Sequence, residues 1–167
     1  MCRILCGSLL AKIDEQIERA AHLAGLLPED RLDGPLDAAG GWTAGDLLGH
    51  LLDCMAGFCA ALYAAEPQRL AHFQQLRELP VNLSISPREF RTRVETYRAR
   101  IAEGFALQED GGLARSIPTV FVPAGVTLLT LLLGNLEHLI NHKRQLFELL
   151  KRMGVKVSTA DLYRLRD

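Results

Sequence analysis

The stretch TLLTLLLGNLEHLINHKRQLFELLKRM, residues 127–153, is the segment that decides the fold. Its apolar residues recur every three to four positions, which is the spacing of one face of an α-helix. Lys151 and Arg152 come just before Gly154, and basic residues followed by glycine are typical of a helix C-terminus. The pattern therefore predicts one long helix from about Thr127 to Met153, with an apolar face that must pack against other helices.

Three other segments have the same helical period. The first runs from about residue 8 to residue 27. The second begins at Thr43, in the capping-box pattern TAGD, and ends near Pro67. The third begins at Ser86, where a serine cap precedes a proline in the first turn, and it ends in the stretch 109–112.

The remaining segments are short. Residues 113–126 combine β-branched side chains with a Pro-Ala-Gly turn, which predicts a short extended crossover before the last helix. Residues 68–85 predict no single element, because their first part fits a short helix and their second part a loop. Four long amphipathic helices with little strand predict an all-α four-helix bundle. With 167 residues, 49% of them hydrophobic, the chain suits a single domain over residues 1–167, with a polar tail at about 155–167.

Composition narrows the expected partners and compartment. The net charge of -1 gives no general attraction to polyanions, and we expect neither nucleic acid nor a membrane as a partner. The apolar run 119–139 is interrupted by Pro123 and Gly125, so it does not predict a membrane span. The four cysteines form no CxxC pair and no regular framework, which favours reduced thiols in a cytoplasmic protein.

Two histidines stand within the leucine-rich helix, at the edge of its apolar face. His138 and His142 are one turn apart, so they lie on one side of the helix, and Gln145 follows on the same side. His50 occupies the same edge-of-core position on the second helix. Facing helices of a bundle bring such side chains together, and three neutral imidazoles with an open fourth position form a catalytic type of zinc site. The alternative is three core histidines that hydrogen-bond to neighbours.

The residues near these histidines have more than one interpretation. Cys54 is either a fourth, soft ligand or, as we favour, a small buried hydrophobe. Asp53 is either an acceptor for the second nitrogen of His50 or a solvated acid. Gln145 either holds a histidine or a metal-bound water, or makes a hydrogen bond within the bundle.

Three other residues are expected to lie outside the site. Trp42 precedes the cap of the second helix and is expected to pack as a hydrophobic staple and not to touch substrate. His22 and His72 have no partner pattern in the sequence. We expect both to be ordinary surface or boundary residues.

The combination of Trp42-x7-His50 with His138-x3-His142-x2-Gln145 resembles the DinB-like superfamily. This superfamily includes the YfiT-type bacillithiol transferases and the mycothiol-dependent maleylpyruvate isomerases. The string WTAGDLLGHLLD, the HxxxHxxQ pattern and the RMGV helix end carry the likeness, which spans most of the chain.

The sequence departs from the superfamily at two positions beside the histidines. Members often read His-Arg-Gly-Gln where this chain has HKRQ, so Arg144 replaces a glycine. Helix geometry directs Arg144 away from the histidines. Asn141 stands where another histidine is common, and we do not expect it to be a ligand.

The resemblance implies a bundle with an unusual connection between helices and one divalent ion, zinc or nickel, on His50, His138 and His142. It also implies a homodimer and a small-molecule thiol or an electrophile as substrate. Catalysis would then use a metal-bound water or thiolate, with Gln145 as a helper, in a metal-dependent thiol transferase or a related hydrolase or isomerase. The alternative is a non-catalytic metal-binding or dimerisation module.

Overall fold

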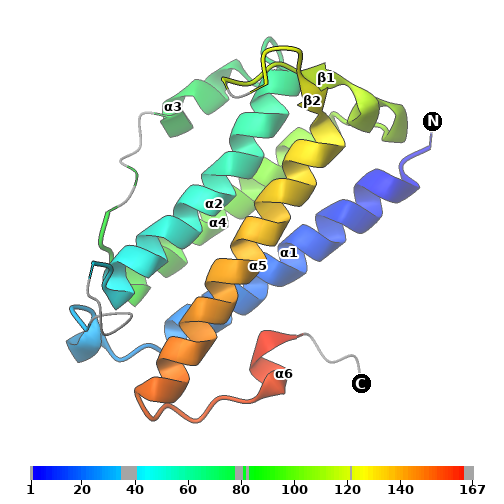
Figure 1. The fold of residues 1–167 in the computed structure, drawn as a ribbon. Coiled ribbons are helices and arrows are strands. Elements are labelled where there is room, and N and C mark those ends of the chain that lie inside the picture. Colours follow the sequence, from blue (N-terminus) through cyan, green and yellow to red (C-terminus); the bar gives the residue numbers. More distant parts are fainter. Residues whose placement is uncertain (1, 35–40, 78–80, 82, 121, 164–167) are drawn as a thin grey trace.

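The computed structural model describes residues 2–34, 41–77, 81, 83–120 and 122–163. Four long helices dominate it (Figure 1). They are α1 (Ile4–Gly25), α2 (Ala44–Ala65), α4 (Pro87–Ala106) and α5 (Leu128–Arg152). The prediction of an all-α four-helix bundle is confirmed.

The shorter elements lie in the connections. They are η1 (Glu29–Arg31), η2 (Ala71–Phe73), α3 (Gln74–Arg77), η3 (Asp110–Ala114) and α6 (Thr159–Leu162). The crossover before α5 holds the strands β1 (Ser116–Ile117) and β2 (Val126–Thr127), which pair antiparallel. The short extended crossover is therefore confirmed.

The helices are not packed in sequence order. α2 packs against α4 and α5, and α1 packs against the same two helices, so α1 and α2 lie diagonally across the bundle. Figure 1 shows α2 and α5 side by side and running in opposite directions. By length and composition α2 could cross a membrane, but 61% of its most apolar stretch is buried within the bundle, as expected of a core helix.

Local capping explains where three of the long helices begin. Thr43 Oγ1 accepts a hydrogen bond from the backbone N–H of Asp46, and the Asp46 carboxylate accepts one from the N–H of Thr43, which completes the predicted capping box. Ser86 Oγ accepts from the N–H of Glu89 at the start of α4. Thr127 Oγ1 caps α5 in the same way.

The first helix differs from its predicted bounds. It begins at Ile4, where the sequence predicts a start at about residue 8, and it ends at Gly25. The earlier start depends on tertiary contacts, because Arg3 donates to the carbonyl oxygen of Phe105 and the N–H of Cys6 donates to Asp110. These partners are about one hundred residues away, so local periodicity does not reveal them.

A glycine on α2 brings the segment before α4 close to the bundle. A Cβ atom on Gly49 would collide with the backbone carbonyl group of Leu83. The N–H of Ile85 donates to the carbonyl oxygen of Gly45, one turn earlier on α2. Residues 83–85 therefore lie directly on the first turns of α2, beside the position of His50.

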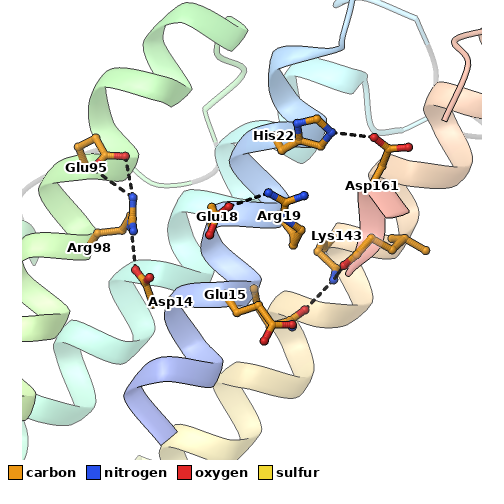
Figure 2. A network of polar contacts seen from close by, with 11 residues as sticks. Asp14, Glu15, Glu18, Arg19, His22, Glu95, Arg98, Lys143 and Asp161 are labelled. Carbon is orange, nitrogen blue, oxygen red and sulfur yellow. Dashed lines mark hydrogen bonds and ion pairs between the residues drawn. The ribbon is translucent and has the colours of Figure 1, made fainter. Parts of the chain in front are cut away.

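The predicted polar tail, as far as residue 163, is packed against α1 and α5. Val155, Val157 and Leu162 contact the core, and α6 has its own capping box. Lys143 on α5 is 2% exposed and donates to Gln16 Oε1 at 2.6 Å and to the carbonyl oxygen of Leu162 at 2.8 Å. Figure 2 shows Lys143 on α5 beside α1 and the tail. The tail thus supplies an acceptor to a buried lysine.

Candidate metal centre

The antiparallel packing of α2 and α5 brings the three predicted histidines together. The Nε2 atom of His50 lies 2.9 Å from Nε2 of His138 and 3.1 Å from Nε2 of His142. The ligand nitrogens of all three residues lie within 4.8 Å of one another. Tetrahedral Zn–N bonds of about 2.0–2.1 Å would place ligand nitrogens about 3.3 Å apart, close to the two short separations.

Neutral imidazoles satisfy this arrangement by hydrogen bonding only if His50 carries its proton on Nε2 and shares it between His138 and His142. A neutral ring has one N–H donor and one acceptor nitrogen, so two facing Nε2 atoms need a proton between them. Where the protons are on Nδ1, the Nε2 lone pairs of His50, His138 and His142 converge and repel one another. A cation at the point of convergence would remove that repulsion.

Gln145 sets the orientation and tautomer of His142. Its Oε1 atom lies 2.7 Å from Nδ1 of His142. If the amide oxygen accepts from Nδ1–H, Nε2 is left as an acceptor that points toward His50. Burial lowers the pKa of His142, and the neighbouring His50 and His138 lower it further, while the contact with Gln145 raises it. The net lowering favours the neutral ring that a metal requires.

Asp53 lies on the other side of His50. Its Oδ2 atom is 3.8 Å from Nδ1 of His50, which is longer than a hydrogen bond but within ion-pair range. The carboxylate therefore faces the nitrogen that does not converge with His138 and His142. At this separation Asp53 makes no hydrogen bond to His50, so its role as an acceptor behind the ligand stays a prediction beside that of a solvated acid.

Trp42 lies against the histidines, which sequence reasoning did not expect. Its ring centroid is 4.7 Å from that of His50, edge to face, and 6.0 Å from that of His142, stacked. The indole is 40% exposed, so it forms one wall of the site and borders solvent. His138 is exposed, whereas His50 and His142 are partly buried. The site is thus open on the side of His138.

The structure separates Cys54 from the group of converging atoms. Cys54 is 4% exposed, and burial raises the pKa of its thiol to about 12, with Asp53 adding to the shift. A protonated thiol is a poor metal ligand. Cys54 is also outside the group formed by the three histidines. These observations support the interpretation of Cys54 as a small buried hydrophobe.

The two other predicted surface histidines have specific partners. His22 Nε2 lies 2.8 Å from Asp161 Oδ1, and Figure 2 shows this pair joining α1 to α6. His72 Nε2 lies 2.8 Å from Glu103 Oε1. Neither residue contributes to the three-histidine group. The partner of His22 lies 139 residues further along the chain, which explains why no local pattern indicated it.

In comparisons with known proteins, this chain shows a likeness to solved structures but not to family models or curated sequences. No model of a protein family matches the sequence, and none of the curated proteins is similar to it. The solved structures include YfiT from Bacillus subtilis, described as a probable metal-dependent hydrolase with an unusual four-helix bundle topology. It is 16% identical with a TM-score of 0.70, and the match covers 93% of this chain and 91% of YfiT.

A second solved structure is the DinB-like protein YjoA from Bacillus subtilis. It is 19% identical with a TM-score of 0.68, and the match covers 90% of this chain and 94% of YjoA. The chain has the DinB-like fold. The resemblance seen in the sequence is therefore confirmed at the level of the fold.

The DinB-like fold also occurs in a larger relative. The mycothiol-dependent maleylpyruvate isomerase matches at 14% identity with a TM-score of 0.57, over 94% of this chain but only 64% of that one. The isomerase therefore contains residues that have no counterpart in this chain. At identities of 14–19% the three likenesses show the fold alone.

Proposed function

We propose that this protein binds one divalent metal ion through His50, His138 and His142 and acts as a metal-dependent thiol transferase or hydrolase. The convergence of three Nε2 atoms at the open edge of the bundle carries the proposal. The descriptions of YfiT as a probable metal-dependent hydrolase and of the isomerase as mycothiol-dependent support it. Imidazole donors suit zinc and nickel, and three histidines leave a position for substrate.

The surrounding residues have roles that follow from their positions. Gln145 holds the ring of His142 with Nε2 turned toward the site. Trp42 shields His50 and His142 on one side. A divalent ion held here would act as a Lewis acid and lower the pKa of a bound water or thiol. Asp53 lies on the Nδ1 side of His50, 3.8 Å away, and we infer that it does not take a proton from a substrate.

Metal analysis of protein purified without an affinity tag is the first experiment. We expect about one zinc or nickel ion per chain, and a His142→Ala variant should lose it. A His72→Ala variant is the matched control, because that histidine lies outside the group. Metal contents that are far below one per chain and equal in the two variants would refute the site.

Activity assays separate an enzyme from a binding module. Loaded and metal-stripped protein should be compared for transfer of bacillithiol, mycothiol and glutathione to an electrophile, and for ester hydrolysis. A rate that depends on metal and on His142 supports the enzyme. Full metal occupancy with no rate above that of the stripped protein would favour a non-catalytic metal-binding or dimerisation module.

The proposal also takes the protein to be a cytoplasmic homodimer. The four cysteines are free, which accords with a reducing compartment. Leu129, Leu133 and Ile140 leave between 36% and 48% of their surfaces exposed on α5, and a second copy would cover such side chains. Sedimentation equilibrium of the wild type and a Leu133→Glu variant tests the dimer.

A further inference from the structure

A cavity of about 610 Å³ lies between α2 and α5 and continues under the crossover. Phe73 and Leu76 form one wall, Ile117 in the crossover forms another, and Leu131 comes from α5. α2 contributes mainly alanine and glycine, which leave the space open. The volume is within the range of about 300–1,000 Å³ that is typical of small-molecule sites.

The cavity lies further along α2 and α5 from the three-histidine site, and none of the three histidines lines it. Asn135, which lines the cavity, is three residues before His138 on α5, a rise of about 4.5 Å. On α2, Gly57 lines the cavity seven residues after His50, a rise of about 10.5 Å. A Cβ atom on Gly57 would lie 2.6 Å from Oδ1 of Asn135, so these two residues meet across the helices. One elongated molecule could therefore lie in both places.

The lining selects an uncharged ligand. None of the described residues that line the cavity is charged, and its surface is mostly apolar. Tyr63 already accepts a hydrogen bond from Gln74, and Thr119 accepts one from the N–H of Val122. By contrast, no described residue makes a hydrogen bond with the side-chain amide of Asn135, which remains available to a ligand at the junction with the histidines.

We propose that this cavity binds the apolar, uncharged arm of the substrate whose reacting group lies at the three histidines. Asn135 would donate to a carbonyl or hydroxyl oxygen of the ligand between the two ends. The ligand class is thus a small electrophile with an alkyl or aromatic arm about 10 Å long, the distance from His138 to Leu131 along α5. The inference rests on the proposed function, since it assigns the reacting end to the metal.

Two series of probes with the same alkyl arms test the cavity. Alkyl hydroxamates have a head group that chelates a divalent ion, whereas N-methyl alkanamides do not. For arms of about four to eight carbon atoms, each buried methylene should tighten binding about fourfold. Titration calorimetry should show this gain per methylene for hydroxamates with zinc-loaded protein. Amides with metal-free protein should show the same dependence on arm length with a smaller gain.

Substitutions on α2 locate the binding. Ala60→Leu and Ala64→Leu place added carbon atoms in the cavity from side chains that are exposed, so the packed core is not disturbed. Both variants should lose the fourfold gain per methylene. Ala106→Leu, an exposed position outside the cavity, is the matched control and should retain it. An affinity independent of arm length, or one unchanged in Ala60→Leu and Ala64→Leu, would overturn the proposal.

The two series also distinguish failure of the cavity from failure of the metal site. If the protein binds no metal but the amides keep a length dependence that Ala60→Leu abolishes, the cavity stands as a binding site and the proposed function fails. If metal binds through His142 but neither series depends on arm length, the proposed function stands and the cavity is refuted as the site of the substrate arm.

Discussion

Oε1 of Gln145 lies 2.7 Å from Nδ1 of His142, one turn further along α5. This contact fixes which nitrogen of the ring is free to bind a metal, because the amide oxygen accepts and Nδ1 must then donate. Metal-ligating histidines usually have such a partner behind them. Gln145 and His142 are three residues apart on one helix, so the pair requires no tertiary packing to form.

Replacing Gln145 should weaken metal binding without removing the site. Gln145→Ala deprives Nδ1–H of its acceptor, and we expect a loss of about 10- to 100-fold in affinity. Gln145→Glu keeps an acceptor and should bind at least as well as the wild type. Competition with a chromophoric chelator measures both affinities. Arg144→Ala, an exposed neighbour, is the control, and equal affinities in all four proteins would contradict the assigned role.

Alanine substitutions at two glycines should change the free energy of unfolding in opposite directions. Gly49→Ala places a methyl group against the backbone of Leu83, which cannot move without shifting residues 83–85. We expect a loss of roughly 1–3 kcal/mol, although alanine favours a helix by about 1 kcal/mol. Gly134→Ala on α5 meets nothing within 4 Å and should gain about 0.5–1 kcal/mol. Urea unfolding measures both, and a stabilised Gly49→Ala would show that residues 83–85 do not pack closely on α2.

The bundle could be predicted from the sequence because its signals are local. The capping box joins Thr43 to Asp46, and the cap at Ser86 joins it to Glu89. Each of these signals lies within four consecutive residues. The edge-of-core positions of His138 and His142 follow from helical spacing in the same way. Local signals are therefore sufficient to predict the helices and the side of α5 on which the imidazoles lie.

Other features depend on contacts between distant segments. The stacking of Trp42 on His142 joins residues one hundred positions apart. The cavity beside Asn135 requires η2, α3 and the crossover to meet over α2. The sequence does not single out Lys143, which is buried and donates to Gln16 and to the carbonyl oxygen of Leu162.

Lys143 should make stability depend on pH in the alkaline range. Burial lowers the pKa of its amine from 10.5 to about 8. Between these two values the unfolded chain binds more protons than the folded one, so the free energy of unfolding rises with pH. The full cost of burying the charged amine is present below about pH 8. Lys143→Met removes this dependence.

The pH dependence is measured by urea unfolding of the wild type and Lys143→Met between about pH 7 and pH 10. Relative to the variant, the wild type should gain on the order of 2–3 kcal/mol across that range. Lys156→Met, an exposed position in the tail, is the control and should change with pH as the wild type does. Parallel curves for the wild type and Lys143→Met would show that the amine of Lys143 is charged and hydrated in the folded protein.

The single tryptophan of the chain should report metal binding directly. Trp42 lies with its ring centroid 4.7 Å from that of His50 and 6.0 Å from that of His142, so an ion on these residues would be within a few ångströms of the indole. Nickel is paramagnetic and quenches a fluorophore at such short range, whereas zinc has a filled d shell and should shift the emission with little loss of intensity. We expect quenching by nickel that saturates at one equivalent in the wild type and in His72→Ala, and that is absent in His142→Ala. Weak, non-saturating quenching of the same strength in all three proteins would mean that nickel reaches Trp42 only by collision from solvent.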